Sequence, residues 1–157
     1  MSENKIKFYL NDKKVEALQD ETIWQVANRL GTEIPHLCYA NKPGYRADGN
    51  CRACMVEIEG ERVLAASCIR KPTNEMKVNT SSEKAKKSRE LVFELLLSDQ
   101  PERDISHDND SKFWNWIDKV EVKESRFPKK TPCQSDTSHP SMAVNLDACI
   151  QCNLCVR

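Results

Sequence analysis

Apolar and polar residues alternate at the start of the chain, and this period of two predicts β-strands. The first strand is expected over residues 5–10, where the apolar positions are Ile6, Phe8 and Leu10. Asn11-Asp12 is a turn-forming pair, so residues 15–18 are expected to return as the second strand of a hairpin. The chain therefore begins with a predicted antiparallel pair.

A second hairpin is predicted further along the chain. Strand-forming residues at 55–58 and 63–64 flank the turn sequence Glu59-Gly60-Glu61. Met76 and Val78 are expected to add the last strand of the same sheet.

Between the hairpins, apolar residues adopt the spacing of an amphipathic helix over residues 21–30. Asp20 is expected to cap its N-terminus and Gly31 to end it. The expected buried face consists of Ile23, Trp24, Ala27 and Leu30. A hairpin, a helix and further strands, with a cysteine-rich loop after the helix, form the element order of a β-grasp domain. We therefore expect an α+β fold for residues 1–80.

Two more helices are predicted after this unit. The first runs from a cap at Ser81-Ser82 to about residue 98. Its expected apolar face consists of Leu91, Val92, Leu95 and Leu96, and its expected solvated face carries Lys84, Lys86 and Lys87.

The second of these helices follows Asp110-Ser111, with apolar residues at i, i+3, i+4 and i+7, namely Phe113, Trp116, Ile117 and Val120. We expect these aromatic residues to pack in a core and not to stack on a cofactor. Residues 121–145 carry prolines among lysine, serine and threonine, so an extended connection is expected there.

Composition argues against several function classes. Lysine plus arginine (24) balances aspartate plus glutamate (24), so no net field favours nucleic acid or an anionic membrane. The N-terminus lacks a signal-peptide core, and the longest apolar run, residues 91–97, is too short to cross a bilayer. We expect a cytoplasmic protein without nucleic-acid partners or membrane insertion. Its eight cysteines are then expected to be reduced metal ligands and not disulfides.

Four cysteines have the spacing of one metal site: Cys38, twelve residues, Cys51, two residues, Cys54, thirteen residues and Cys68. Iron needs soft, deprotonated sulfur ligands, and in a [2Fe–2S] cluster two cysteines hold each iron. Gly44 and Gly49 in the intervening loop allow backbone N–H groups to approach sulfur. The alternative is a structural zinc site with four cysteine ligands. Such sites usually pair two short C-x2–4-C units, and only Cys51 and Cys54 form one here.

The segment IPHLCYANKPGYRADGNCRACMVEIEG, followed by AASC, resembles one known domain. That domain is the N-terminal [2Fe–2S] domain shared by the large iron–sulfur subunit of respiratory NADH dehydrogenase, the diaphorase of NAD-reducing hydrogenases and the α subunit of NAD-dependent formate dehydrogenases. Plant-type ferredoxins place only four residues between their first two ligands, whereas this chain has twelve. The resemblance implies that Cys38, Cys51, Cys54 and Cys68 bind a [2Fe–2S] cluster.

Many members of that group bind a further cluster through H-x3-C-x2-C-x5-C. With His107 in the first position, the three cysteine positions are occupied by Ser111, Trp114 and Val120. We therefore expect no cluster there and a surface or helix-capping role for His107. The other residues without a spaced ligand set are His36, His139 and Cys133. The two histidines are expected to be structural or to support a site through hydrogen bonds.

The tail, HPSMAVNLDACIQCNLCVR, resembles the opening of a two-cluster [4Fe–4S] ferredoxin domain, C-x2-C-x2-C-x3-C. Cys149, Cys152 and Cys155 would supply three ligands of a [4Fe–4S] cluster, and the fourth would fall at position 159. A zinc knuckle or a [3Fe–4S] site is the alternative. We expect the beginning of a longer protein: residues 1–80 form the [2Fe–2S] domain, 81–140 a helical and extended connector, and 141–157 the truncated start of a [4Fe–4S] domain.

The missing His/Cys motif and the segment LLLSDQPERDISHDNDSKFWNWIDKV are most similar to the α subunit of soluble NAD-dependent formate dehydrogenases. The resemblance implies a molybdenum or tungsten bis-pterin site downstream, and partner subunits that carry flavin and iron–sulfur clusters and bind NAD. This segment of the oxidoreductase would carry electrons only, without catalytic residues. The alternatives are the iron–sulfur subunit of NAD-reducing hydrogenase or NADH dehydrogenase and, in another class, a zinc-stabilised subunit-docking module.

Overall fold

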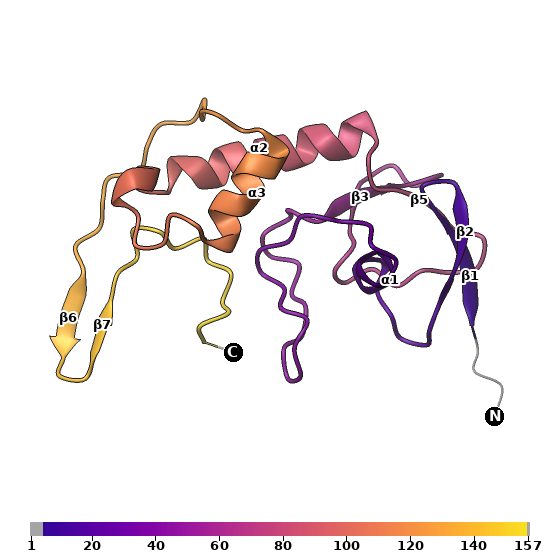
Figure 1. Cartoon of the computed structure of the whole chain (residues 1–157), viewed down its shortest axis with the longest axis horizontal. Helices are drawn as coiled ribbons and strands as arrows, with labels where there is room; N and C mark the ends of the chain where they lie inside the picture. The colour runs from indigo at the N-terminus through magenta and orange to yellow at the C-terminus, as the bar shows by residue number, and fades with distance from the viewer. Residues whose placement is uncertain (1–4, 157) are drawn as a thin grey trace.

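The computed structural model describes residues 5–156 and opens with the predicted hairpin (Figure 1). Strands β1 (Ile6–Leu10) and β2 (Lys13–Ala17) pair antiparallel across the turn residues Asn11 and Asp12. Both turn residues have positive φ, 49° and 65°, which is the conformation that a two-residue hairpin turn of type I′ requires.

Three further strands complete a five-stranded sheet in the order β2-β1-β5-β3-β4. They are β3 (Met55–Ile58), β4 (Ala65–Ala66) and β5 (Lys77–Asn79). Strand β5 lies in the centre, parallel to β1 and antiparallel to β3. The fold is thus mixed α+β, with the last strand inserted beside the first.

The predicted return strand of the second hairpin is wrong by two residues. Met55 pairs with Ala66 and Val56 with Ala65, whereas Val63 is 61% exposed in the connection. Ala66 is 4% exposed and belongs to the core. Its burial favours this pairing of β3 with β4, because a shift by one residue would turn Ala66 to the other face of the sheet.

Helix α1 (Ile23–Arg29) packs on the sheet, but its N-cap is Thr22 and not the predicted Asp20. The Gln25 N–H donates to the Thr22 hydroxyl (3.3 Å), and the Thr22 N–H donates to the Gln25 side-chain carbonyl (2.9 Å). This reciprocal capping box satisfies two N–H groups at once. Asp20 lies in the preceding turn with φ 69°. Gly31, with φ 75°, follows the helix end as predicted.

The first core lies between α1 and the sheet. Its fully buried side chains include Phe8, Ile23, Val26 and Val56.

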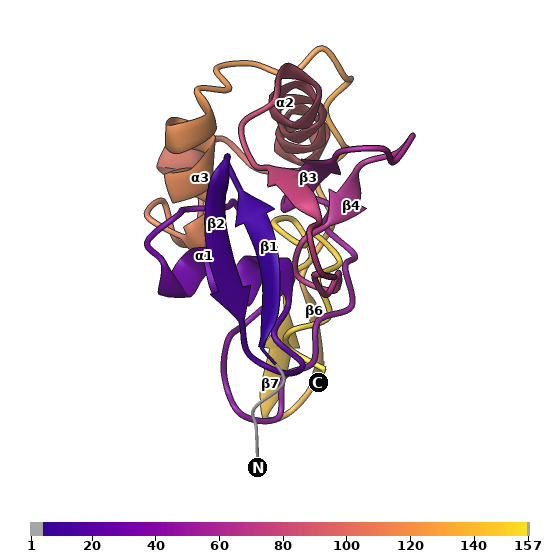
Figure 2. The same cartoon turned by 90° about the vertical axis from the view of Figure 1, so that its right-hand side faces the viewer.

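Helix α2 (Glu83–Ser98) starts at the predicted cap, Ser82, and packs against β3; Figure 2 shows it nearly end-on above that strand. Its predicted apolar face is correct only in part: Leu96 packs against the buried cluster around Phe93, whereas Leu95 is 52% exposed. The residues that it buries are Ala85, Arg89, Phe93 and Ser98. Arg89 sets this orientation because its guanidinium donates two hydrogen bonds to a carbonyl of β3. The three lysines near its start are exposed, as expected.

Helix α3 (Lys112–Val120) follows a short 3-10 turn, η1 (Arg103–Ile105), and crosses α2 in Figure 1. Phe113, Trp114 and Ile117 are its buried residues. They form a second core with Phe93 of α2 and with the cysteine-bearing loop, which contributes Leu37, Cys38, Cys51 and Ala53. The loop is therefore held between the sheet unit and the two helices.

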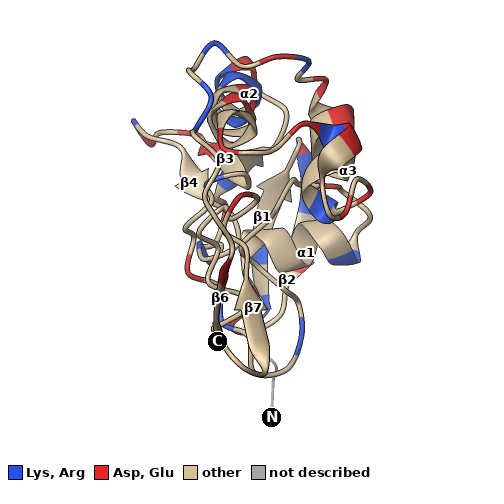
Figure 3. Ribbon diagram, turned by 90° about the vertical axis from the view of Figure 1, so that its left-hand side faces the viewer, with Lys and Arg blue, Asp and Glu red and all other residues tan. Residues whose placement is uncertain are grey.

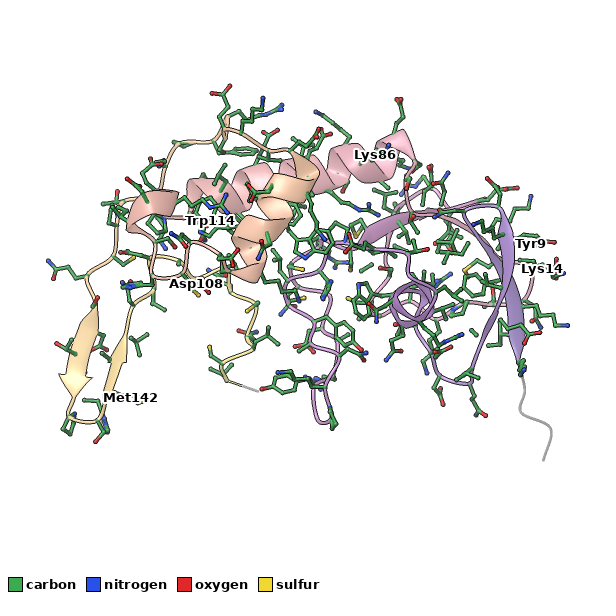
Figure 4. The ribbon with its side chains drawn as sticks, in the orientation of Figure 1. Tyr9, Lys14, Lys86, Asp108, Trp114 and Met142 are labelled. Carbon is green, nitrogen blue, oxygen red and sulfur yellow. The ribbon has the colours of Figure 1, made fainter. Side chains whose placement is uncertain are left out.

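The remainder of the chain is largely extended, as expected, but contains a hairpin that the sequence pattern did not predict. Strands β6 (Asp136–His139) and β7 (Met142–Val144) pair antiparallel and are exposed throughout. Figure 4 shows Met142 at the far end of this hairpin, away from both cores. Strand β6 is polar and β7 apolar along its whole length, so neither shows the alternation that indicates a strand.

Acidic and basic residues are interspersed over α2 and α3 (Figure 3), in keeping with the balanced composition. In the part of the chain that the structure describes, no helix is both long enough and apolar enough to cross a membrane.

Candidate metal centre

The loop after α1 and the two ends of the β3–β4 hairpin bring four cysteines together beneath the helices. Cys38 and Cys51 lie on the loop, Cys54 directly precedes β3, and Cys68 follows β4. The exposed fractions of these four residues are 0%, 9%, 1% and 1%. Such burial of four thiols at one end of a sheet creates a compact sulfur-lined site.

The four cysteines are arranged as two pairs. The Cys38 N–H donates to the Cys51 sulfur, and the Cys51 N–H donates to the Cys38 sulfur, both at 3.4 Å. The thiols of Cys54 and Cys68 are hydrogen-bonded to each other. Ser67 supports the second pair, because its N–H and its hydroxyl donate to the Cys54 carbonyl at 3.2 Å and 2.7 Å.

Each pair combines one acidified thiol with one that holds its proton. The hydrogen bond from Cys38 lowers the pKa of Cys51 to about 6, and the bond from Cys68 lowers the pKa of Cys54 to about 7. The same bonds, together with burial, raise the pKa of Cys38 and of Cys68. Each pair thus favours one thiolate beside one thiol, and loading a metal requires that both thiols lose their protons.

The donor set fits a cluster with two irons. The eight cysteines form no disulfide bond, and four of them present soft sulfur in two pairs. Two thiolates for each iron is the ligand arrangement of a [2Fe–2S] cluster. Within residues 5–156, no three His, Cys, Asp or Glu side chains converge closely enough to hold a single metal ion.

Backbone N–H groups surround the first pair. Besides the Cys38 N–H, those of Leu37 and Ala53 point to the Cys51 sulfur and favour its thiolate. Gly49 is buried in this loop with φ 67°, a conformation that favours glycine. These donors would stabilise negative charge on the sulfurs.

His36 packs in an aromatic wall beside the site and is not brought to the cysteine pairs as a ligand. Its ring centroid lies 4.4 Å from Trp24 and 6.1 Å from Trp116. Burial, with the Lys112 charge as a second cause, lowers the pKa of His36 to about 4. The imidazole is therefore neutral at physiological pH, consistent with the expected structural role.

The second cysteine set is not gathered into a site in this structure. Cys149 and Cys152 are partly exposed and Cys155 is exposed. Cys152 nevertheless packs against the second core, which also contains Cys38 and Cys51. The remaining candidates lie elsewhere on the surface: Cys133 is exposed and His107 contacts Asn145 at 2.9 Å. The His139 ring accepts a hydrogen bond from the Ser141 N–H at 3.2 Å.

Two charged residues that lie beside the site were not expected from the sequence pattern. Arg89 of α2 donates to the Met55 carbonyl at 3.0 Å and 2.7 Å, and Lys112 of α3 donates to the Tyr39 carbonyl at 3.1 Å. Arg89 was detectable in principle, since it is four residues from both Ala85 and Phe93 on one helical face. For Lys112, the first residue of its helix, the sequence offered no such indication.

A comparison with family models matches residues 3–83 to the 2Fe-2S iron-sulfur cluster binding domain. An NADH-quinone oxidoreductase subunit from Rickettsia felis is 28% identical over 162 residues, which cover 97% of this chain and 23% of that protein. The NADP-reducing hydrogenase subunit HndD of Solidesulfovibrio fructosivorans is 31% identical over 153 residues, which cover 93% of this chain and 26% of that protein. The chain thus spans about a quarter of these curated relatives.

The fold is also similar to that of a solved structure, the NAD+-reducing [NiFe]-hydrogenase in the H2-reduced state. The TM-score is 0.83 at 27% sequence identity, and the match covers 96% of this chain and 64% of the other. The family match spans the sheet, α1 and all four buried cysteines. The chain belongs to the family of 2Fe-2S iron-sulfur cluster binding domains.

Proposed function

We propose that this chain is the electron-transfer module of an NAD-linked oxidoreductase complex and that Cys38, Cys51, Cys54 and Cys68 are its [2Fe–2S] ligands. One iron is assigned to Cys38 and Cys51 and the other to Cys54 and Cys68. The main support for this proposal is that four buried cysteines form two hydrogen-bonded pairs inside the matched domain.

When bound, such a cluster accepts and releases one electron at a time. The chain supplies the thiolates, the N–H groups that stabilise their charge and the helices that shield them from water. No nucleophile or general base is assigned, because the cofactor performs the redox chemistry while the protein sets its potential and position.

The complex is inferred from the relatives. Subunits of NADH-quinone oxidoreductase and of NAD(P)-reducing hydrogenases are similar to this chain over nearly its whole length. We therefore assign it flavin- and iron–sulfur-containing partner subunits that exchange electrons with a nicotinamide. Cys149, Cys152 and Cys155 are assigned to a [4Fe–4S] cluster of the same relay, completed by ligands downstream.

A formate dehydrogenase is the more specific form of this proposal. It is favoured by Ser111, Trp114 and Val120 at the positions where related subunits carry the cysteines of a further cluster. In that case the downstream polypeptide holds a molybdenum or tungsten bis-pterin site. The coding sequence beyond residue 157 tests this: a cysteine at position 159 and a pterin-binding region support it, and a hydrogenase-type or NADH-dehydrogenase-type continuation rejects it.

The cluster assignment is tested on the purified protein. We expect a red-brown solution with about two irons and about two acid-labile sulfides per chain from this site. Reduction with dithionite should produce a rhombic electron paramagnetic resonance signal. A colourless protein with one bound zinc would instead support the zinc-stabilised docking module.

The ligand assignment is tested by Cys54→Ser. Loss of one thiolate from a buried pair should remove nearly all cluster absorbance and destabilise the residue 1–80 unit, because folding and cluster binding are coupled. The matched control is Cys133→Ser, a change at an exposed cysteine outside the pairs, which should retain iron, sulfide and thermal stability. Normal cluster content in Cys54→Ser would contradict the assignment.

A further inference from the structure

The two helices that follow the sheet each extend one cation to the cysteine site. Arg89 reaches from α2 to the carbonyl of Met55, and Lys112 reaches from α3 to the carbonyl of Tyr39. Met55 directly follows Cys54, and Tyr39 directly follows Cys38. Each cysteine pair therefore has one cation bound next to its first member.

Neither cation is balanced by a carboxylate in the part of the chain that the structure describes. Within residues 5–156, the hydrogen bonds of Arg89 and Lys112 go to backbone carbonyls, and neither residue forms an ion pair with a carboxylate. Arg89 is only 8% exposed. A buried guanidinium without an anion is costly, so its burial indicates that negative charge belongs nearby.

The negative charges that act on the two cations are those of cysteine sulfurs. Burial lowers the pKa of Arg89, and Cys54 opposes this shift. Burial of the ammonium likewise lowers the pKa of Lys112, and Cys51, Cys38 and Cys152 oppose the shift. Most of the Lys112 residue is exposed, and its ammonium is the part that contacts the cysteine loop, through the Tyr39 carbonyl. It faces the first pair and one cysteine of the second set together.

We propose that Arg89 and Lys112 are positioning residues that offset the charge of the [2Fe–2S] cluster, one at each cysteine pair, and that both raise its reduction potential. This inference rests on the cluster assignment proposed above. It extends the site beyond the matched domain, residues 3–83, to two helices. Helix α2 begins at the last residue of that match, and α3 lies entirely outside it.

The direction follows from charge balance. Reduction by dithionite would oxidise the dithionite and add one electron, and therefore one negative charge, to the four-thiolate unit, without a proton moving on either cation. A neighbouring positive charge stabilises the more negative, reduced form. The effect of Lys112 should be partly screened by salt because this residue is exposed, whereas that of Arg89 should be insensitive to salt.

The decisive variant is Lys112→Met in the full chain with its cluster. A potentiometric titration followed by visible absorbance should show the equilibrium constant for reduction falling roughly tenfold, which corresponds to about 59 mV for a one-electron couple. Lys112→Arg should restore the potential, since it retains the charge. Added 1 M KCl should narrow the difference between wild type and Lys112→Met.

The matched control is Lys86→Met, which removes the same formal charge from an exposed lysine of α2 (Figure 4) that, among the described residues, donates no hydrogen bond to the cysteine segments. Its potential should equal that of the wild type. At the second pair, Arg89→Gln keeps a donor for the Met55 carbonyl but removes the charge, so it should lower the potential at both low and high salt. Arg89→Lys should lower it less.

The outcomes separate this inference from the cluster assignment. A wild-type protein without iron and sulfide would overturn the assignment itself. Lys112→Met with full cluster content and a potential equal to that of Lys86→Met would overturn the role of Lys112 and leave the assignment intact. Loss of the cluster in Arg89→Gln with retention in Arg89→Lys would support the need for charge beside Cys54.

Discussion

At the residue scale, Gly49 shows how closely the cysteine loop approaches the segment after β4. A Cβ at this position would lie 3.1 Å from the Cδ1 atom of Ile69, the residue that follows Cys68. Gly44 in the same loop has a similar positive φ, 85°, but open space around it. Both glycines therefore adopt a backbone conformation that disfavours a side chain, but only Gly49 also lacks the space for a Cβ.

We expect Gly49→Ala to weaken the site more than Gly44→Ala. Both changes force a left-handed residue with a Cβ, at about 1–2 kcal/mol each, and only Gly49→Ala also displaces Ile69 beside Cys68. Urea unfolding of the two variants and the rate of iron transfer to a chelator would show the difference. Equal rates of iron loss would mean that the contact with Ile69 is unimportant for the cluster.

Single residues also mark the limit of prediction from the sequence. Asp20 and Thr22 are both short polar residues before an apolar helical pattern, and either could have capped α1. The choice is made by Gln25, whose side chain completes a reciprocal pair of hydrogen bonds with Thr22 only. The spacing of the cysteines, in contrast, can be read directly from the sequence, so the candidate ligands could be identified without the structure.

At the element scale, α2 connects the sheet to the second core. Arg89 ties the helix to β3, and Phe93, fully buried, lies 6.2 Å from Phe113 of α3 between ring centroids. The apolar pattern favoured a face through Leu95, because hydropathy counts the leucines of α2 as apolar and passes over Arg89 and Ser98, which are in fact buried. A buried arginine with a backbone partner cannot be recognised from hydropathy alone.

Phe93→Ala should therefore destabilise the fold by about 3–5 kcal/mol, as for other fully buried aromatic residues. Leu95→Ala, at a position that is 52% exposed on the same helix, should change stability by less than about 1 kcal/mol. Chemical denaturation of the cluster-loaded proteins would measure both. A larger loss in Leu95→Ala would contradict the observed orientation of α2.

At the scale of the whole molecule, two cores meet at the cysteine loop. The first core joins α1 to the sheet and includes Cys54 and Cys68, whereas the second joins the loop to α2 and α3 and includes Cys38 and Cys51. The two assigned irons would therefore be held by different cores. Element order predicted the sheet unit, but no sequence pattern indicated that the following helices would pack on the loop, since that contact is between distant segments.

Removing the iron should loosen α3 as well as the loop. We expect chelation under reducing conditions to increase amide hydrogen exchange in residues 37–54 and in α3, because they share the second core. The β1–β2 hairpin should stay protected, since its partners are backbone groups of the sheet. If exchange rose in the loop alone, the second core would not depend on the cluster.

The packing of α3 over the first cysteine pair has a consequence for the order of biosynthesis. The last assigned ligand, Cys68, precedes the first residue of α3, Lys112, by 43 intervening residues. At about 5–20 residues per second, the ribosome needs on the order of 2–9 s to make that stretch. During this interval all four thiols exist before their cover does, so the nascent chain offers the machinery that delivers iron and sulfide an open site that the finished protein has closed.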